Sequence, residues 1–385
     1  MSSPDSLACP HCALRVDIPD LPHGHKAHCP RCGAHLTTYR HRAFDRVLAC
    51  AMAALIFLIL AVPFEFLSFS ARGQSEHITI IQGLATLVDN DYWFLAIIQV
   101  VAIFAIPLSI LLGLLYVLLP LKAGILAPQA RFVMTLTLAL LPWGMAEIFL
   151  VGALVSLIKI ASMADIGLGM SFYAYIAFTL CFILTLKFLD PAQLKMAVLQ
   201  ERQLQHHERS PLTARQASES IQRTWALLLT ATLLYIPSNL LPIMYTRVLG
   251  EDEPSTILGG VITLWKSGSY PIAIIIFVAS VFVPVAKLLV LGWLNYSVQK
   301  GHQQRPRERQ VAYQITEFIG RWSMVDVFVV AILVSLIQLG NAMSVYPGPA
   351  AIAFCGVVVL TMLAAITFDS RLIWHSQNLE YDRQH

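Results

Sequence analysis

Charged residues are scarce in this chain of 385 residues. Asp, Glu, Lys and Arg make up 13% of it, against about 25% in an average soluble protein. Hydrophobic residues make up 57%. This composition excludes a soluble globular protein, a disordered chain and a nucleic-acid-binding protein. The formal net charge of +3 is too small to indicate an anionic partner. We therefore expect most of the chain to lie in lipid.

Motifs for nucleotide hydrolysis and hydrolytic catalysis are also missing. The chain has no Gly-x-x-x-x-Gly-Lys-Ser/Thr loop, no His-Glu-x-x-His and no Gly-x-Ser-x-Gly. We therefore predict that the protein is not an enzyme. Uphill transport would need a proton gradient, a partner ATPase or a downhill lipid gradient.

Long apolar runs, in contrast, are abundant. A helix needs about 20 apolar residues to cross a bilayer, and eight runs are long enough. They cover residues 44–68, 93–120, 132–160, 169–189, 222–246, 270–297, 322–340 and 347–368. Helices are expected because the runs are too continuously apolar for alternating barrel strands. The first run follows a polar segment, so we interpret it as a span and not as a cleaved leader.

Lys and Arg residues set the expected orientation. Most of the 26 basic residues fall in the segments that share one side with the N-terminus. Because cytoplasmic segments carry the excess of Lys and Arg, both termini are predicted to be cytoplasmic. Two outer segments, 79–88 and 256–265, have helical apolar spacing and are expected to form short helices.

The two halves of the chain match each other in sequence. At a shift of 177 residues the matches include Thr79, Gly83 and Pro107 with Thr256, Gly260 and Pro284. At a shift of 179 they include Trp143, Phe149 and Ser156 with Trp322, Phe328 and Ser335. We therefore predict an all-α membrane protein of two tandem four-helix repeats, which are parallel because four spans is an even number.

This organisation divides the chain into five parts. A cytoplasmic ribbon covers residues 1–42, and the first four-helix repeat covers 43–190. A polar cytoplasmic linker follows at 191–221. The second four-helix repeat covers 222–370, and a cytoplasmic tail covers 371–385.

Four cysteines before the first span form two Cys-x-x-Cys pairs, Cys9 with Cys12 and Cys29 with Cys32. Two such knuckles at this spacing are typical of a zinc ribbon with four thiolate ligands. The segment is too short to form a core, so the metal must supply its folding energy. A four-cysteine site has no open position, which indicates structural zinc. A rubredoxin-like iron site and a metal-free segment are the alternatives.

Two ionisable residues lie within predicted spans of the second repeat, Lys287 and Asp326. Charges in lipid are costly, which makes them functional candidates. Their predicted depths allow pairing if the two helices are neighbours. The hydroxyl groups of Ser280, Ser323 and Thr361 could add hydrogen bonds. The alternative is a structural ion pair that fixes the helix register.

Prolines interrupt several spans. Pro237, Asn239 and Pro242 stand close together near the outer end of the fifth run. They indicate either a broken helix that lines a cavity or a simple helix end. Pro107 and Pro284 are expected to kink the second and sixth spans.

The chain resembles the paraquat-inducible protein A family, in particular its LetA branch. The resemblance rests on the paired cysteines ahead of two four-span units and on four further motifs. These are Tyr235-Ile-Pro-Ser-Asn-Leu-Leu-Pro-Ile-Met244, Pro284-x-x-Lys287, Trp322-Ser-Met-Val-Asp326-Val-Phe328 and Phe368-Asp369. Family members often carry a second cysteine ribbon before the second unit, and this chain has none.

The resemblance implies a multi-pass protein of the bacterial inner membrane. Such proteins work with periplasmic MCE-domain proteins, which form tunnels for phospholipid between the two membranes. The second repeat would have a tetraspanin-type fold with a buried polar network for proton coupling. Residue by residue, that network would fall on Ser280, Lys287, Ser323, Asp326 and Thr361.

Three functional hypotheses follow. The first is a phospholipid-transport subunit that exchanges lipid with an MCE-domain partner. The second is a membrane scaffold or assembly factor for an envelope complex. The third is a small-solute exporter or a redox membrane protein.

Overall fold

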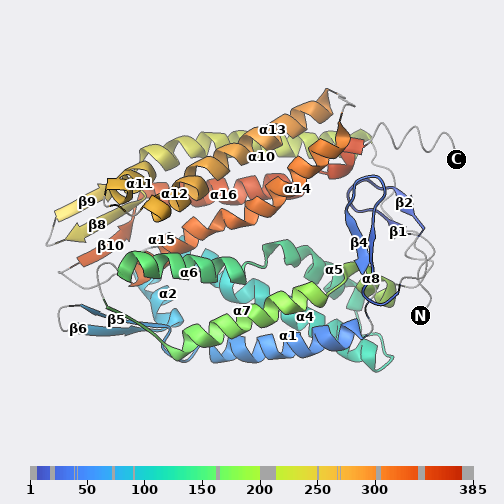
Figure 1. Ribbon diagram of the computed structural model, residues 1–385, viewed down its shortest axis with the longest axis horizontal. Helices are drawn as coiled ribbons and strands as arrows, with labels where there is room; N and C mark the ends of the chain where they lie inside the picture. The colour runs from blue at the N-terminus through green and yellow to red at the C-terminus, as the bar shows by residue number, and fades with distance from the viewer. Residues whose placement is uncertain are drawn as a thin grey trace.

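The computed structural model describes residues 7–17, 22–38, 40, 42–71, 74–89, 92–161, 165–199, 214–248, 251–266, 268, 270–300, 305–336 and 343–374. Helices dominate and run along the long axis of the molecule, as Figure 1 shows. A small cysteine-containing β unit lies at one end of the helices, and two three-stranded sheets lie at the other.

The first half contains eight described α-helices and two short turns of other helix types. They are α1 (Ala43–Leu60), α2 (Ile80–Asp89), α3 (Trp93–Val100), the π-turn η1 (Val101–Ala105), α4 (Ile106–Lys122), α5 (Ala130–Leu140), the 3-10 turn η2 (Leu141–Trp143), α6 (Ala146–Ala161), α7 (Met170–Phe188) and α8 (Pro191–Val198).

The second half repeats much of this order. It contains α10 (Ala214–Leu240), α11 (Ile257–Lys266), α12 (Tyr270–Phe277), the π-turn η3 (Val278–Phe282), α13 (Val283–Gln299), α14 (Pro306–Trp322), α15 (Met324–Leu336), α16 (Pro349–Thr367) and the 3-10 turn η4 (Ser370–Trp374). Helices are therefore present at both of the short outer segments for which the sequence predicted them, as α2 and α11.

Six helices of the described part are long and apolar enough to cross a membrane. They are Ala43–Leu60, Trp93–Lys122, Ala130–Leu157, Met170–Phe188, Ala273–Gln299 and Pro349–Thr367. All six overlap predicted spans. The other two predicted spans, 222–246 and 322–340, fall on α10 and α15. The described part of α15 has only 13 residues and follows α14 after Ser323.

A π-helical turn precedes a proline in each half. η1 ends just before α4, which carries Pro107 in its first turn, and η3 stands in the same relation to Pro284 of α13. A proline lacks a backbone N–H and its ring clashes with the carbonyl four residues earlier. A widened turn relieves that clash, so these prolines produce π-turns at the places where the sequence predicted kinks.

Two antiparallel sheets were not predicted. The first has the order β6-β5-β7, from β5 (Leu67–Ala71), β6 (Gln74–Ile78) and β7 (Asp165–Leu168). The second has the order β10-β8-β9, from β8 (Met244–Val248), β9 (Glu251–Ser255) and β10 (Met343–Pro347). The ends of the predicted spans 44–68 and 222–246 are therefore wrong, because the chain becomes extended after Pro63 and Pro242.

The two halves pack against each other through α15. This helix belongs to the second half and contacts α6, α2 and α3 of the first. The ring centroid of Phe328 lies 5.6 Å from that of Phe149. The hydroxyl of Ser156 donates to the carbonyl oxygen of Val329 at 3.4 Å. Each half also has its own close pair, α1 with α7 and α10 with α16.

Candidate functional site

Two β-hairpins carry the four N-terminal cysteines. Strands β1 (Leu7–Ala8) and β2 (Arg15–Val16) flank the first pair, and β3 (Lys26–His28) and β4 (His35–Thr38) flank the second. Each knuckle closes with a backbone bond, from Ala13 N to Cys9 O at 2.9 Å and from Gly33 N to Cys29 O at 2.8 Å. Ala13 and Gly33 both have positive φ, so the two knuckles share one backbone form.

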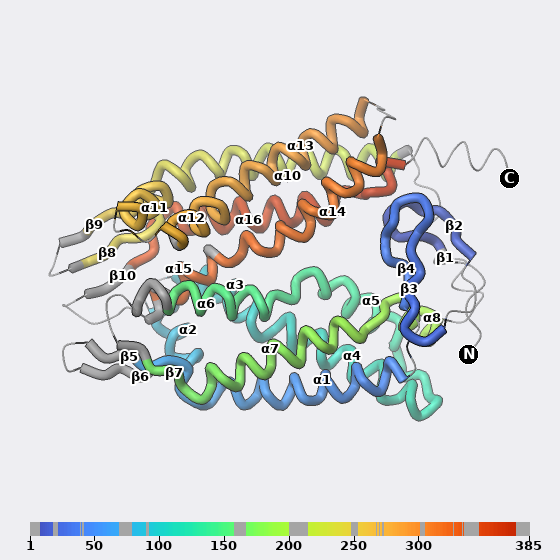
Figure 2. Tube along the Cα trace, viewed as in Figure 1, coloured from blue at the N-terminus to red at the C-terminus, as the bar shows by residue number. Residues whose placement is uncertain are grey.

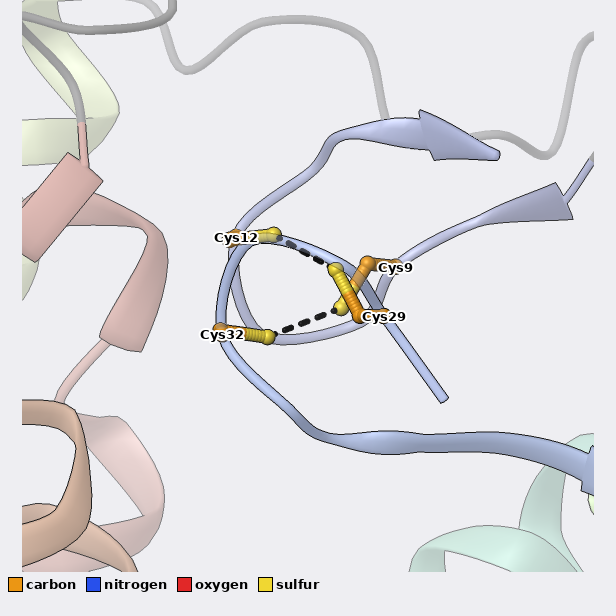
Figure 3. Close-up of side chains that lie close together, drawn as sticks. All are labelled: Cys9, Cys12, Cys29 and Cys32. Carbon is orange, nitrogen blue, oxygen red and sulfur yellow. Dashed lines mark hydrogen bonds between the residues drawn. The ribbon is translucent and has the colours of Figure 1, made fainter. Parts of the chain in front are cut away.

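The four sulfur atoms converge on one point, as Figure 3 shows. All four lie within 4.8 Å of one another. The Sγ atoms of Cys9 and Cys32 are 3.5 Å apart, as are those of Cys12 and Cys29. Tetrahedral ligands with bonds of about 2.3 Å would place sulfurs about 3.8 Å apart. The cluster therefore fits a single tetrahedral metal ion and is too open for disulfides.

The cluster is shielded from solvent. Cys9, Cys12 and Cys29 are buried and Cys32 is partly exposed. Hydrogen bonds from the thiols of Cys12 and Cys32 lower the pKa of Cys9. Hydrogen bonds with the thiols of Cys32 and Cys9 raise the pKa of Cys12, and a bound metal ion would favour the thiolate form at all four sulfurs. These four cysteines, which the sequence predicted as ligands, thus form a site that could hold a metal ion.

The ribbon, defined here as residues 7–38, is held to the first half by Asp190. The carboxylate of Asp190 accepts the hydroxyl of Thr37 at 2.8 Å and the backbone N–H of Thr38 at 2.7 Å. It also caps α8, accepting the backbone N–H of Ala192 at 2.9 Å. The side chain of Gln193 donates to the carbonyl of Thr38 at 2.7 Å.

The ribbon is held to the second half by α14 and η4. Ser370 donates to the backbone oxygen of His11 at 3.3 Å, and His11 Nδ1 lies 3.4 Å from the amide nitrogen of Gln310. Gln310 in turn accepts the indole N–H of Trp374 at 3.2 Å. Figure 2 shows the ribbon trace beside α8 on one side and near the start of α14 on the other.

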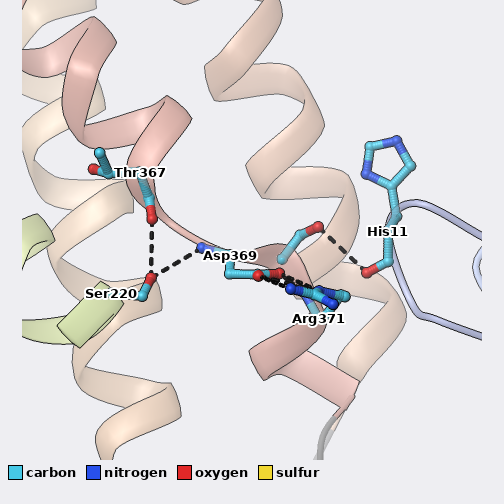
Figure 4. A network of polar contacts seen from close by, with 6 residues as sticks. His11, Ser220, Thr367, Asp369 and Arg371 are labelled. Atoms are coloured by element: carbon cyan, nitrogen blue, oxygen red, sulfur yellow. Dashed lines mark hydrogen bonds and ion pairs between the residues drawn. The ribbon is translucent and has the colours of Figure 1, made fainter. Parts of the chain in front are cut away.

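A polar network closes the end of α16 beneath this contact. Ser220 of α10 donates to the carbonyl of Thr367 at 2.9 Å and accepts the backbone N–H of Asp369 at 3.2 Å. The carboxylate of Asp369 pairs with the guanidinium of Arg371. Figure 4 shows this network next to His11, so it positions the segment on which the ribbon rests.

Sequence analysis did not single out Asp190 as a functional residue. One signal was available, because Asp190 and Asp369 stand 179 residues apart, the shift that relates the second parts of the halves. Asp369 bonds the side chain of its own half, Arg371, whereas Asp190 bonds the ribbon. The two corresponding aspartates, Asp190 and Asp369, thus make different contacts in the two halves.

The residues predicted for an intramembrane polar network lie on helices α13, α15 and α16, on the π-turn η3 and, for Ser323, in the turn between α14 and α15. Lys287 of α13 is 2% exposed, and its ammonium group donates to the hydroxyl of Ser323 at 3.5 Å. Ser280, in η3, and Thr361, in α16, are buried. Thr361 donates to the backbone oxygen of Val358 at 3.0 Å. The side chain of Asp326, predicted to pair with Lys287, lies outside the described residues.

The proline-asparagine segment stands at the end of α10. The helix continues through Pro237 to Leu240 and ends before Pro242. Asn239 donates to the carbonyl of Tyr235, one turn earlier in the same helix, at 2.9 Å. Its buried Oδ1 has no hydrogen-bond partner among the described residues. Pro237 therefore lies inside the helix, and Pro242 lies beyond its last residue.

In the first half, Glu147 occupies the position that corresponds to Asp326 at a shift of 179 residues. Glu147 lies in the first turn of α6, and one of its carboxylate oxygens is buried without a hydrogen-bond partner in the described part of the chain. Ile110 stands where the second half has Lys287. The two halves therefore differ in their intramembrane charges, as their sequences indicated.

Comparisons with known proteins agree on one family. The sequence model described as "Paraquat-inducible protein A" matches twice, at residues 44–197 and 221–378. The Intermembrane transport protein PqiA of Escherichia coli K12 is 38% identical over 96% of each chain.

Two more distant relatives match over similar lengths. The Lipophilic envelope-spanning tunnel protein A of Escherichia coli K12 is 28% identical, over 98% of this chain and 94% of the relative. A Probable intermembrane transport protein of Haemophilus influenzae is also 28% identical, over 98% and 97%. No solved structure matches. The chain, with its cysteine ribbon and long apolar helices, therefore belongs to the paraquat-inducible protein A family.

Proposed function

We propose that this protein is an inner-membrane subunit of a system that moves phospholipid between two membranes. The observation that carries the proposal is similarity over 96% of the chain to a protein named for intermembrane transport. The long apolar helices are consistent with that role. The protein acts as a transporter subunit and not as an enzyme.

The proposed membrane arrangement has eight spans in two tandem, parallel four-helix repeats. The two matches to one family model support it, as does the repeated order of π-turn, proline-bearing helix and three-stranded sheet. In this arrangement α10 and α15 are the fifth and seventh spans. The ribbon and both termini are cytoplasmic, and the two sheets face the periplasm.

The partner is a periplasmic MCE-domain protein. It would dock on the end of the molecule opposite the ribbon, where the two sheets and the short helices α2 and α11 lie (Figure 1). This end offers exposed apolar side chains, including Ile81, Ile262 and Trp265. Phospholipid is the cargo that passes between the membrane and this partner.

The metal of the ribbon is zinc in a structural role. The four sulfur atoms are the ligands that zinc takes in closed tetrahedral sites, and no fifth donor is needed. Once bound, zinc supplies the folding free energy of the ribbon. Cys9, Cys12, Cys29 and Cys32 hold it.

The energy source is a proton gradient coupled through the second half. Lys287 and Ser323 lie in contact between α13 and the start of α15. A change of charge on Asp326, in α15, would change its attraction for Lys287 and so bias the packing of these helices. Ser280 and Thr361 would supply further hydrogen bonds.

A transfer assay tests this function. The full chain is reconstituted in vesicles that contain a fluorescent phospholipid, with and without an MCE-domain protein from the same cell. We expect lipid transfer only when both proteins are present. Stable binding of the MCE-domain protein without any transfer, under a proton gradient of either sign, would instead indicate a membrane scaffold.

A further inference from the structure

A basic pocket lies where the ribbon meets the second half. It has a volume of about 380 Å³ and is lined by Arg31, Arg305, Pro306, Arg307, Glu308 and Trp374. These residues come from three separate parts of the chain, namely the second knuckle of the ribbon, the start of α14 and the end of η4. Three guanidinium groups and one carboxylate give the lining a positive net charge.

The three arginines are fixed in different ways. The guanidinium of Arg31 lies over the indole ring of Trp374, 5.9 Å from the ring centroid. This contact places the Arg31 guanidinium beside Trp374 at the pocket. Arg307 donates through Nε to the backbone oxygen of Arg31 at 3.1 Å. This hydrogen bond does not involve the two terminal nitrogens of Arg307.

Among the described residues, the Arg305 side chain is held by a contact that an anion can replace. Its NH1 lies 3.4 Å from both carboxylate oxygens of Glu308, and the two side chains are 77% and 65% exposed. Exposed ion pairs contribute about 0–1 kcal/mol, so exchange of Glu308 for a second anion costs little.

The backbone at the pocket is also suited to an anion. Arg305 precedes α14 in the left-handed conformation, with φ of 52°, and its own side chain makes no capping hydrogen bond. The first backbone N–H groups of a helix and its dipole favour negative charge. Pro306, at the first helical position, presets the helical backbone there.

We infer that this pocket binds the phosphate group of an anionic ligand. Guanidinium groups bind phosphate through paired, charge-assisted hydrogen bonds, and three of them face one pocket here. Two sources share this chemistry, a phospholipid headgroup of the adjacent membrane surface and a free phosphate compound. The inference does not depend on lipid transport, because it concerns binding alone.

The pocket is complete only when the ribbon is folded. Arg31 stands between the ligands Cys29 and Cys32, so its position depends on the second knuckle. Bound phosphate would join Arg31 of the ribbon to Arg305 and Arg307 of α14. The site therefore links occupancy by an anion to the docking of the ribbon on the second half.

Binding can be measured on the purified full chain in neutral detergent. The probes are dioctanoylphosphatidic acid, inorganic phosphate and dioctanoylglycerol, which lacks a phosphate, each titrated against fluorescently labelled protein. The variants are Arg305→Gln and the double variant Arg305→Gln/Arg307→Gln. Arg131→Gln is the matched control, because Arg131 is exposed in the first turn of α5, the counterpart of α14 in the first half.

We expect at least one phosphate-bearing probe to bind and dioctanoylglycerol not to bind. The double variant should bind at least about tenfold more weakly, a loss of about 1.4 kcal/mol, while Arg131→Gln is unchanged. Arg305→Gln alone should also weaken binding. The described ion pair of Arg305 is with Glu308 of α14, so this single change should leave the docking of the ribbon undisturbed.

The probes separate the two sources. Tighter binding of dioctanoylphosphatidic acid than of inorganic phosphate identifies a lipid headgroup, and equal binding identifies a free phosphate compound. The inference is overturned if neither phosphate-bearing probe binds. It is also overturned if both arginine variants bind as tightly as the native protein.

Discussion

The carboxylate of Asp190 accepts the backbone N–H of Thr38 at 2.7 Å, although 152 residues separate the two. The same carboxylate caps α8 through Ala192 and Gln193. One side chain thus joins the last strand of the ribbon to the start of α8. Because Asp190 is 9% exposed, these bonds are largely shielded from water.

Replacement of Asp190 by Ala should release the ribbon from the first half. The change leaves the N–H of Thr38 and the hydroxyl of Thr37 without their acceptor, at a cost of about 1–3 kcal/mol for a buried group. We expect faster hydrogen exchange across residues 35–38 and a lower midpoint of thermal unfolding.

The exposed ribbon residue Asp17 provides the control for this change. Asp17→Ala removes the same charge at a position on the ribbon surface, so exchange across residues 35–38 should stay as in the native protein. Equal exchange rates in Asp190→Ala and the native protein would show that Asp190 does not hold the ribbon.

Metal removal should unfold the ribbon and leave the helices intact. Metal ligands provide the folding free energy in such short segments. We expect one zinc per chain by elemental analysis, and loss of metal in Cys12→Ser and Cys29→Ser. A chelator should increase proteolysis within residues 7–38, while the helical circular dichroism signal remains.

A cysteine within a span serves as the control for the metal. Cys50 of α1 lies outside the four-cysteine cluster, so Cys50→Ser should retain the metal in full. A protein that contains iron and shows the absorption of an iron–thiolate centre would contradict the zinc assignment. A cluster that binds no metal after expression with excess zinc would do so too.

Local patterns were sufficient to predict much of this structure. The spacing of the four cysteines predicted their convergence, since each knuckle needs only a few residues to form. Apolar runs located the long helices because lipid requires about 20 apolar residues whatever the neighbours are.

Features that depend on distant residues were not predictable in this way. The sheets β6-β5-β7 and β10-β8-β9 join segments far apart in sequence, such as Leu67 with Leu168. Strands β5 and β8 begin inside the predicted apolar runs 44–68 and 222–246, so hydrophobicity gave no separate signal for them. The role of Asp190 depends on Thr37 and Thr38, which belong to another part of the chain, and no motif around Asp190 identifies them.

Close packing between the halves should make Gly152 intolerant of larger residues. A Cβ atom at Gly152 would lie 3.0 Å from the Cβ of Phe328 and 3.4 Å from the carbonyl oxygen of Val325. Overpacking of this kind costs about 1–3 kcal/mol. We expect Gly152→Ala to lower the midpoint of thermal unfolding and Gly152→Val to lower it further.

Gly292 in α13 is the matched control for this prediction. A Cβ there meets no atom within 4 Å, so Gly292→Ala adds helix propensity without a clash. Its unfolding midpoint should be equal to or above that of the native protein. If the two alanine variants unfold at the same temperature, α6 and α15 do not pack as closely as described.

Lys287 should matter for transport more than for stability. Its ammonium group is buried and lies 3.5 Å from the hydroxyl of Ser323, close to Gly320. Burial of an ammonium group is costly, and an apolar residue of similar volume avoids that cost, while a buried carboxyl group left without its partner can remain neutral. We therefore expect Lys287→Met to fold, with an unfolding midpoint no lower than that of the native protein.

Transport should separate this variant from its control. If Lys287 couples protons to lipid movement, Lys287→Met loses transfer by more than about tenfold, because one barrier rises by at least about 1.4 kcal/mol. Ser323→Ala, which removes the hydroxyl partner, should reduce transfer less. Lys300→Met, at the exposed end of the same helix, should transfer lipid at the native rate. A Lys287→Met protein that transfers lipid as fast as Lys300→Met would leave Lys287 with a structural role and remove proton coupling through this contact.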